Sequence, residues 1–317
     1  MNKAVIAIHG GAGAITRSQL SAEKEQQYIQ ALSAIIEAGQ AILEAGGSAL
    51  DAVTEAVRLL EENPLFNAGI GAVFTHAGTH ELDACVMDGN TLNAGAVAGV
   101  SHIRNPILAA RAVLEHSPHV LLISEGAETF AQQHGLEPVS SEIFSTEERW
   151  EQLQRARENH QTVLDHSSHE PLDPDHKFGT VGAVALDKFG NLAAATSTGG
   201  MTNKLPGRVG DSPIVGAGCY ANNANVAVSC TGTGEVFMRT LAAYDIAALM
   251  EYGGLSLHQA TERVIMEKLP ALNGVGGAIA IDNEGNVALP FNSEGMYRGY
   301  GYAGDAPSVG IYRDQER

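Results

Sequence analysis

The sequence has few positively charged residues. Its 317 residues include 19 Lys and Arg against 37 Asp and Glu, so the formal net charge is −18. A uniformly acidic surface repels phosphate backbones and anionic lipids, because bringing like charges together raises the free energy of association. The composition therefore argues against nucleic-acid and membrane partners and is typical of a well-solvated surface.

Cysteine is rare, and long apolar runs are missing. The three cysteines, Cys85, Cys219 and Cys230, are an odd number without close spacing, which argues against a disulfide framework. Each is expected to pack as a small hydrophobic group, although Cys230 precedes Thr231 and a catalytic thiol is the alternative. No stretch approaches the ~18 apolar residues of a membrane span, and residues 1–9 are too short for the apolar part of a secretory signal. We therefore expect a cytoplasmic protein.

Proline is also infrequent, with 11 residues against 36 glycines. Glycine exceeds its usual share of about 7%, which favours tight turns between strands over collagen or a flexible tail. Hydrophobic residues make up 44% of the chain, so it can bury a substantial core. A chain of this length forms one large or two ordinary domains.

Apolar periodicity predicts a mixture of helices and strands. Helical spacing predicts a helix over residues 22–44, and Ser48 begins a second helix that reaches about residue 62. The glycine run at residues 10–13 is expected to break the first strand. The expected strands are 4–8, 81–87, 94–100 and 119–123, and further helices begin after Pro106 and cover about 127–134, 146–158, 235–250 and 256–268.

One internal repeat predicts how strands pair. Residues 182–192 and 277–287 are both apolar strands that turn at Asp-x-x-Gly-Asn into another strand, which is a hairpin signal. Similar hairpins among helices predict a layered α/β fold with largely antiparallel sheets.

Residues 160–179 form a polar, proline-bearing segment with four histidines and little apolar content. We expect this segment to be an exposed, flexible linker. A metal site is the alternative, although the histidine spacing lacks the paired pattern of a zinc motif.

The linker ends at the pair Gly179-Thr180, where an apolar strand begins. Glycine leaves its carbonyl open to attack and tolerates a strained backbone, while threonine supplies a hydroxyl. A cut before Thr180 would give it a free α-amine with a reference pKa of about 7.7–8.0, and this amine can act as general base for the hydroxyl of its own residue. The pair is a candidate self-cleavage site, and an ordinary junction of loop and strand is the alternative.

Several short motifs follow one another along the chain, at residues 8–13, 67–71, 81–84, 179–182, 196–200, 207–213 and 231–235. Together they make this sequence resemble the plant-type asparaginase / isoaspartyl aminopeptidase family of N-terminal-nucleophile (Ntn) hydrolases, and the resemblance covers nearly the whole chain. It implies one α/β Ntn-hydrolase domain over residues 1–317, built as a four-layer αββα sandwich. It further implies self-cleavage into an alpha subunit of residues 1–179 and a beta subunit of residues 180–317, assembled as an (αβ)2 heterotetramer.

The resemblance also implies an activity and its catalytic residues. The expected enzyme is a threonine-type amidohydrolase that hydrolyses isoaspartyl (β-aspartyl) dipeptides and L-asparagine, releasing L-aspartate. Thr180 would be the nucleophile, and the hydroxyl of Thr198 would hydrogen-bond to it. The Thr231 hydroxyl and the Gly232 N–H would form the oxyanion hole.

Arg208 and Asp211 would bind the α-amino-acid end of the substrate. The guanidinium group suits a carboxylate, and the carboxylate of Asp211 suits an ammonium group; an ordinary surface salt bridge is the alternative. Other substrate-binding positions implied by the resemblance are Asn67, Val209, Gly210, Thr231, Gly232, Thr233 and Gly234.

No cofactor is expected for catalysis, but the loop over residues 60–70 resembles one that wraps a structural sodium ion. Carbonyl oxygens suit such a hard cation, and a loop without an ion is the alternative. The implied ligands are the backbone carbonyls of Leu60, Glu61, Asn63, Phe66, Ala68 and Ile70.

Other functions stay open at this point. A glycosylasparaginase-like amidase, a protease-like relative and an uncleaved, non-catalytic binding protein are the alternatives. The sequence does not choose between asparagine and isoaspartyl dipeptides, because both present the same aspartyl end to Arg208 and Asp211. A phosphate-binding role for residues 10–13 is disfavoured, because this run lacks the full pattern of such a loop.

Overall fold

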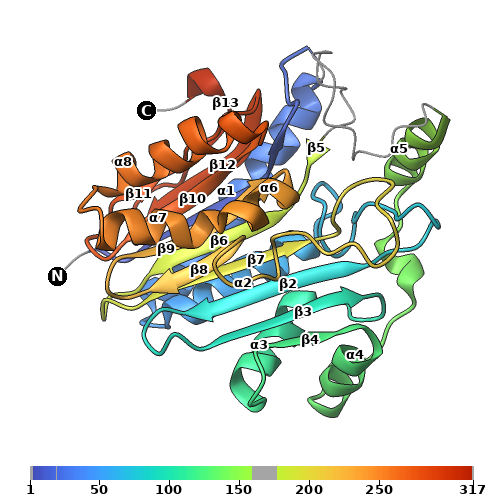
Figure 1. Ribbon diagram of the computed structural model, residues 1–317, viewed down its shortest axis with the longest axis horizontal. Helices are drawn as coiled ribbons and strands as arrows, with labels where there is room; N and C mark the ends of the chain where they lie inside the picture. Colours follow the sequence, from blue (N-terminus) through green and yellow to red (C-terminus); the bar gives the residue numbers. More distant parts are fainter. Residues whose placement is uncertain (1–2, 19, 159–176, 316–317) are drawn as a thin grey trace.

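The computed structural model describes residues 3–18, 20–158 and 177–315, and within them two sheets lie face to face between two layers of helices (Figure 1). The larger sheet has nine strands and the smaller has four, counted over these ranges. This arrangement is the αββα sandwich that the family resemblance implied. The linker expected over residues 160–179 lies outside the described residues except for its last three positions.

The larger sheet has the strand order β13-β12-β1-β6-β7-β2-β3-β4, with β5 paired to β1. Neighbouring strands are antiparallel apart from the parallel pair β3–β4. Its strands are β1 (Val5–Gly13), β2 (Leu82–Asp88), β3 (Ala94–Val100), β4 (Leu121–Ile123), β5 (Lys177–Phe178), β6 (Val181–Leu186), β7 (Leu192–Thr198), β12 (Gly295–Tyr302) and β13 (Ser308–Tyr312).

The prediction that residues 10–13 break the first strand is wrong. Strand β1 continues through these glycines to Gly13, and its register with β12 shifts between His9 and Gly11. A Cβ added at Gly10 would lie 2.3 Å from the ring of Phe66. Glycine is required here because another part of the chain approaches the strand closely, and the strand itself does not end.

The smaller sheet has the order β11-β10-β9-β8 and packs against the larger one through buried apolar side chains. Cys85 and Cys219 are buried between the two sheets, and Cys230 is buried under the helices, all three as free thiols. The strands of this sheet are β8 (Cys219–Asn222), β9 (Val226–Gly232), β10 (Gly276–Asp282) and β11 (Val287–Ala288).

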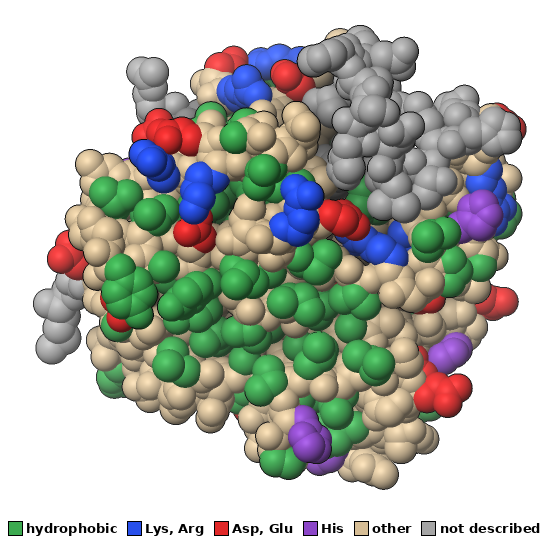
Figure 2. Space-filling model, viewed as in Figure 1, with side chains coloured by type: hydrophobic (Ala, Val, Ile, Leu, Met, Phe, Trp, Pro, Cys, Tyr) green, Lys and Arg blue, Asp and Glu red, His purple; other side chains and the backbone are tan. Residues whose placement is uncertain are grey.

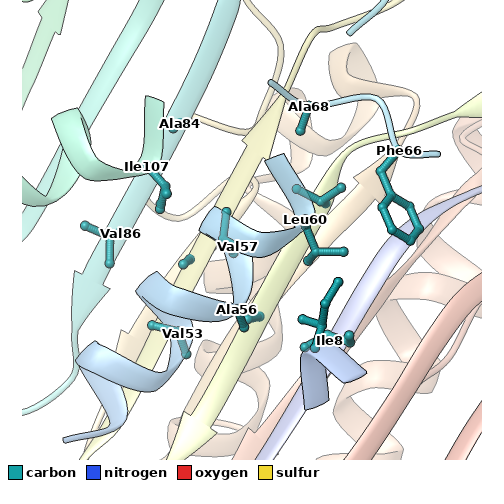
Figure 3. Close-up of a cluster of buried hydrophobic side chains, with 14 of the residues drawn as sticks. Ile8, Val53, Ala56, Val57, Leu60, Phe66, Ala68, Ala84, Val86 and Ile107 are labelled. Atoms are coloured by element: carbon teal, nitrogen blue, oxygen red, sulfur yellow. The ribbon is translucent and has the colours of Figure 1, made fainter. Parts of the chain in front are cut away.

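Helices cover the outer face of each sheet. On the larger sheet, one face of α2 packs Val53, Val57 and Leu60 into a core with Ile8 and Ile107 (Figure 3). The helices associated with the larger sheet are α1 (Ala22–Glu44), α2 (Ala49–Glu61), α3 (Pro106–His116), α4 (Ser124–Gln133), the 3-10 turn η1 (Ser141–Phe144) and the C-terminal 3-10 turn η4 (Arg313–Gln315). Helix α5 (Glu147–Glu158) follows η1 and packs Trp150 against Phe74. Those on the smaller sheet are α6 (Gly234–Thr240), α7 (Ala242–Glu251), α8 (Leu257–Glu262), the π-helical turn η2 (Arg263–Lys268) and the 3-10 turn η3 (Pro270–Leu272).

The single helix predicted over residues 235–250 is interrupted at Leu241. This residue has a left-handed backbone, with a φ of 49°. The N–H groups of Ala243 and Tyr244 bind the carbonyls of Ala217 and Gly216, so they do not continue the ladder of α6. Tertiary hydrogen bonds to this loop explain why the chain forms two helices here.

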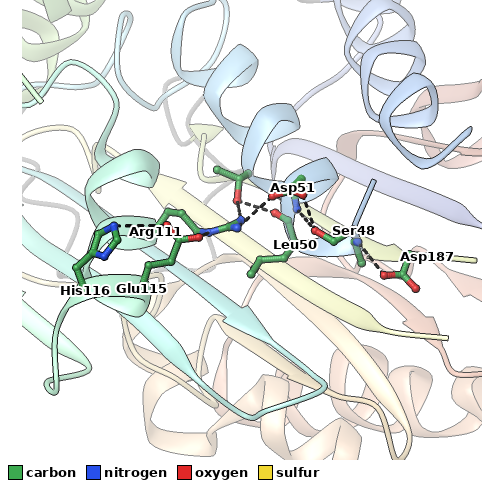
Figure 4. Close-up of polar contacts among 9 residues, drawn as sticks. Ser48, Leu50, Asp51, Arg111, Glu115, His116 and Asp187 are labelled. Carbon is green, nitrogen blue, oxygen red and sulfur yellow. Dashed lines mark hydrogen bonds and ion pairs between the residues drawn. The ribbon is translucent and has the colours of Figure 1, made fainter. Parts of the chain in front are cut away.

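The start of α2 is fixed to its neighbours by polar contacts (Figure 4). The Ser48 Oγ accepts the Asp51 N–H at 3.1 Å and donates to the Asp51 carboxylate at 2.7 Å. Arg111 of α3 donates to Asp51 at 3.1 Å, and Asp187 accepts the Ala49 N–H at 3.2 Å. Because Asp187 lies in the β6–β7 turn, these contacts hold α2 against the centre of the larger sheet.

The predicted repeat is confirmed as two equivalent hairpin turns, one in each sheet. Asp187 Oδ1 accepts two backbone N–H groups of the β6–β7 turn at 2.9 and 3.0 Å. Asp282 Oδ1 accepts the equivalent pair of the β10–β11 turn at 3.0 and 2.9 Å. An aspartate side chain therefore closes each of the two turns in the same way.

Over the described ranges, none of the helices has the length and apolar character needed to cross a bilayer.

Candidate active site

Antiparallel pairing places the candidate nucleophile. Thr180 directly precedes β6, and Thr198 is the last residue of β7, so the start of one strand lies beside the end of the other. The Thr180 Oγ1 donates to the Thr198 Oγ1 at 3.0 Å, and the Gly200 N–H donates to the same oxygen at 3.0 Å. With the Thr198 oxygen fixed by that backbone donor, the Thr180 hydroxyl is held in one orientation. Thr180 is only 8% exposed.

The residue before the nucleophile is packed tightly against Asn67. A Cβ added at Gly179 would lie 2.2 Å from the Asn67 Cβ, so glycine is needed here. The Asn67 Nδ2 donates to the Gly200 carbonyl at 2.7 Å, its Oδ1 accepts the Val73 N–H at 2.9 Å, and its own carbonyl accepts the Gly199 N–H at 3.0 Å. Asn67 therefore lies beside the candidate cut and fixes the turn after β7.

A small cavity of about 10 Å³ opens beside the Thr180 hydroxyl. The structure brings six predicted site residues together around it and adds three that sequence reasoning did not single out: Gly200, Met201 and Ser212. Gly200 and Ser212 lie within the motifs at residues 196–200 and 207–213, which was the available signal. The six predicted residues in the lining are Thr180, Thr198, Arg208, Gly210, Asp211 and Gly232.

Two charged groups converge on Gly234, near this cavity. A Cβ at Gly234 would lie 2.9 Å from both an Arg208 terminal nitrogen and the Asp211 Oδ1. The Arg208 Nε donates to the Glu235 Oε1 at 2.8 Å, so Glu235 is a site residue that the sequence analysis missed. Glu235 directly follows the Thr-Gly-Thr-Gly motif. The missing side chain at Gly234 leaves room for Arg208 and Asp211 to approach one another.

Two buried oxygens in this region find no hydrogen-bond partner among the described residues: Asp211 Oδ2 and Ser212 Oγ. A buried polar atom without a partner is costly, so these oxygens are suited to a polar ligand. Burial raises the pKa of the Asp211 carboxyl to about 7, although the nearby Arg208 cation lowers it in part. Asp211 is therefore poised to become a carboxylate near neutral pH.

The end of β9 supplies the predicted oxyanion donors. The Thr231 Oγ1 accepts the Ala12 N–H at 3.3 Å, which leaves the hydroxyl hydrogen available to donate elsewhere. Gly232 lines the cavity with a φ of 151°, and a Cβ there would lie 2.3 Å from the Val275 carbonyl. Thr233 instead bonds to Val275 through its hydroxyl. Asn67, Val209, Thr231, Thr233 and Gly234 are not part of the cavity lining.

A buried polar network lies between the sheets close to the nucleophile. The His9 Nε2 lies 2.9 Å from the Ser229 Oγ, which lies 2.7 Å from the Thr196 Oγ1. Burial lowers the pKa of His9 to about 3, so the ring is neutral at physiological pH. A Cβ at Gly182 would lie 1.9 Å from the Ser229 Oγ, which explains the glycine two residues after Thr180. Sequence reasoning missed this network, although His9 lies in the first motif.

In the loop after α2, backbone carbonyl oxygens lie close to two glycines. A Cβ at Gly71 would lie 2.6 and 2.8 Å from the carbonyl oxygens of Pro64 and Phe66, and one at Gly69 would lie 2.4 Å from the carbonyl of Glu61. The carbonyls of Leu60, Glu61 and Asn63 each accept a backbone hydrogen bond. Each of these three carbonyls keeps a second lone pair, so these hydrogen bonds do not prevent the three oxygens from facing a cation.

The side chain of Glu61 connects this loop to the catalytic strand. Its Oε1 accepts the Ser197 hydroxyl at 2.6 Å and the Ile107 N–H at 2.9 Å. Burial raises the pKa of Glu61 to about 8, so the carboxyl is mostly protonated at neutral pH. Ser197 directly precedes Thr198, and the loop is therefore joined to the residue that orients the nucleophile.

Comparison with known proteins identifies the family of this chain. The family described as Asparaginase matches residues 2–311. The isoaspartyl peptidase of Escherichia coli (strain K12) is 76% identical over 315 residues, covering 99% of this chain and 98% of that protein. The isoaspartyl peptidase of Salmonella typhimurium is 76% identical over 314 residues, covering 99% and 100%. The isoaspartyl peptidase/L-asparaginase of Xenopus laevis is 40% identical over 297 residues, covering 93% and 91%. The chain therefore belongs to the asparaginase family, as its motifs predict.

Proposed function

We propose that this protein is a self-processing, N-terminal-threonine amidohydrolase that releases L-aspartate from isoaspartyl dipeptides and L-asparagine. The observation that carries the proposal is the Thr180–Thr198 hydroxyl pair, 3.0 Å apart, in one cavity with Arg208 and Asp211. Relatives that are 76% identical over nearly the full chain are named isoaspartyl peptidases, which supports the same chemistry here.

The first step is cleavage of the chain before Thr180. The Thr180 Oγ attacks the Gly179 carbonyl carbon, the acyl group moves from nitrogen to oxygen, and water hydrolyses the resulting ester. The products are an alpha subunit of residues 1–179 and a beta subunit of residues 180–317. The close packing of Gly179 against Asn67 supports this step, because it restrains the carbonyl next to the hydroxyl.

Turnover uses the α-amine that this cut creates. The Thr180 Oγ attacks the side-chain carbonyl of the aspartyl group, its proton passes to the α-amine, and that amine then protonates the leaving amine or ammonia. A β-aspartyl ester of Thr180 forms, and water releases L-aspartate. The Thr231 hydroxyl and the Gly232 N–H stabilise the negative oxygen, and removing such a donor typically costs about 10²–10³ in kcat.

Arg208 and Asp211 recognise the free α-amino-acid end of the substrate. The guanidinium group binds the carboxylate, and the Asp211 carboxylate with the Ser212 hydroxyl accepts from the ammonium group. The Asp211 Oδ2 and the Ser212 Oγ, which have no hydrogen-bond partner among the described residues, support this role. Glu235 holds the Arg208 side chain, with the Nε–Oε1 distance at 2.8 Å.

Two further proposals concern a bound sodium ion and the assembly of two processed units. The loop of residues 60–70 would hold a structural sodium ion through the carbonyls of Leu60, Glu61, Asn63, Phe66, Ala68 and Ile70. The close approach of the Phe66 carbonyl to Gly71 and of the Glu61 carbonyl to Gly69 supports this proposal. Two processed units would associate as an (αβ)2 heterotetramer. Hydrophobic side chains gather over the face that carries α7 (Figure 2), where Leu241 and Tyr244 are 47% and 36% exposed.

The self-cleavage proposal is tested with Thr180→Ala. The variant lacks the attacking hydroxyl, so we expect one chain of 33.2 kDa, whereas the unaltered protein yields two fragments and the smaller one begins at Thr180. Denaturing mass spectrometry with N-terminal sequencing measures this. Thr180→Ser keeps a hydroxyl and serves as the matched control. Cleavage of the alanine variant between residues 179 and 180 would contradict the proposal.

The role of Arg208 is tested with Arg208→Ala. Loss of a charge-assisted contact of about 1.5–3 kcal/mol should raise KM for L-asparagine about 10- to 100-fold while processing is retained. Steady-state kinetics and denaturing gels measure the two effects. Arg239→Ala, which removes an exposed arginine on α6, should leave both unchanged. An unaltered KM in Arg208→Ala would exclude this role.

The pH dependence of binding follows from the raised pKa of Asp211, about 7. The ammonium group of the ligand binds the carboxylate form, so affinity should increase as the pH rises through about 7. The inhibition constant of L-aspartate, measured between pH 5.5 and 8, should fall about tenfold per pH unit at most below that pKa. Asp211→Asn should bind weakly and lose this dependence; an equally steep dependence in the variant would assign it to another group.

The sodium proposal is tested by thermal unfolding in sodium chloride and in choline chloride at equal ionic strength. An ion that binds only the folded state stabilises it by RT ln(1 + [L]/Kd), so Tm should be higher in sodium. Gly71→Ala, which fills the space between the carbonyls, should remove the difference. Equal Tm values for the unaltered protein in the two salts would count against the ion.

A further inference from the structure

The residues that recognise substrate lie on a segment without regular structure, which we call the specificity loop (residues 200–212). It connects β7 with β8 and carries Arg208 and Asp211. Positive φ values at Gly200 (83°), Asn203 (65°) and Gly207 (84°) bend it repeatedly. Because the loop is neither helix nor strand, contacts from elsewhere must fix the spacing of its two charged groups.

Those contacts come from residues 74–81, which we call the clamp segment. Main-chain hydrogen bonds join the Asn203 N–H to the Phe74 carbonyl at 2.9 Å and the His76 N–H to the Lys204 carbonyl at 2.8 Å. Glu81 contributes twice. Its carbonyl accepts from the Lys204 Nζ at 2.7 Å, and its Oε2 accepts the Gly207 N–H at 2.8 Å.

Lys204 is an unusual anchor because its ammonium group is almost completely buried, with the residue 5% exposed. Burial lowers the pKa of Lys204, the carboxylates of Asp83 and Glu81 oppose that shift, and the Arg208 cation adds to it. Asp83 is the cross-strand partner of Thr198. The anchor of the loop is therefore electrostatically connected to both the binding arginine and the strand that orients the nucleophile.

Aromatic rings pack around Phe74, at the start of the clamp segment. The ring of Phe74 lies 4.1 Å from that of His80 and 5.2 Å from that of Trp150, measured between centroids. Trp150 lies on α5, and Arg149 of that helix donates to the carbonyl of Gly71, three residues before the clamp segment, at 2.8 Å. A segment packed in this way can fix the loop that it touches.

We propose that Glu81 is a positioning residue for substrate recognition, acting with Lys204 to hold Arg208 and Asp211 at the spacing that the substrate requires. The Glu81 side chain reaches the Gly207 N–H, one residue before Arg208, so its loss acts directly on the binding arginine. This inference rests on the proposed function. It adds that Glu81, which precedes the proposed cleavage site, controls the positions of Arg208 and Asp211, which follow that site.

Glu81 is only partly buried, which makes its side chain a suitable target for substitution. We would compare Glu81→Ala, which removes the acceptor, with Glu81→Gln, which keeps an oxygen for the Gly207 N–H. Glu137→Ala removes an exposed carboxylate far along the chain from the loop and is the matched control. Lys204→Met removes the ammonium group and keeps an unbranched apolar side chain.

Each protein would be checked for processing and then assayed with L-asparagine and one isoaspartyl dipeptide, and its affinity for L-aspartate would be measured by calorimetry. We expect Glu81→Ala and Lys204→Met to process, to keep kcat within about twofold, and to raise both KM and the Kd for L-aspartate about three- to tenfold, the loss expected for one hydrogen bond. Glu81→Gln and Glu137→Ala should resemble the unaltered protein.

The possible results distinguish failure of the positioning role of Glu81 from failure of the proposed function. Unchanged KM and Kd in Glu81→Ala overturn the positioning role, and so does a fall in kcat alone, because the clamp would then act on the chemistry. Failure of Glu81→Gln to restore binding also overturns it, since the acceptor would not be what matters. An unaltered protein that processes yet neither hydrolyses the substrates nor binds L-aspartate would refute the proposed function, and the inference with it.

Discussion

The antiparallel pairing of β6 with β7 determines where the reactive hydroxyl lies and what surrounds it. The pairing sets Thr180, at the start of one strand, beside Thr198, at the end of the other. A shift of one residue would turn the side chains of β6 to the opposite face of the sheet. The buried apolar residues on both faces of the larger sheet oppose such a shift, so the 3.0 Å contact between the two hydroxyls follows from the core packing of the whole sandwich.

Burial shifts the pKa values of two titratable groups near this contact. His9 is neutral because burial lowers its pKa to about 3, and Glu61 is mostly protonated because burial raises its pKa to about 8. His9 and Glu61 therefore place little charge against the strands that carry the nucleophile near neutral pH. The charged groups gather instead on the specificity loop and its clamp segment, where a zwitterionic substrate would need them. This separation lets the site bind a charged ligand next to an uncharged nucleophile.

Much of this organisation could be predicted from the sequence, where local signals were strong. The helix over residues 22–44 and the strand over residues 94–100 have the predicted bounds, and the repeated Asp-x-x-Gly-Asn turns form equivalent hairpins. The errors come from long-range contacts. The glycines at residues 10–13 stay in the strand because Phe66 approaches them, and the helix predicted over residues 235–250 breaks because a loop near residue 216 binds its N–H groups.

In the candidate site, too, residues with a local sequence signal were predicted, and those placed by long-range contacts were not. Motifs identified Thr180, Thr198, Arg208 and Asp211, which the fold brings around one cavity. Local sequence gave no reason to connect Glu81 with Lys204, because a contact across 123 positions depends on the packing of the whole chain. Val209 and Thr233 were implied as binding residues by their neighbours in a motif, and their side chains lie outside the cavity lining.

During turnover the Thr180 hydroxyl is proposed to carry the aspartyl group of the substrate. Acid quenching during steady-state hydrolysis of L-asparagine, followed by mass spectrometry of the beta subunit, measures this directly. The account predicts a species heavier by one aspartyl group, with the addition located on Thr180 by fragmentation. Active turnover with no such species at any quench time, or with the group on another residue, would contradict it.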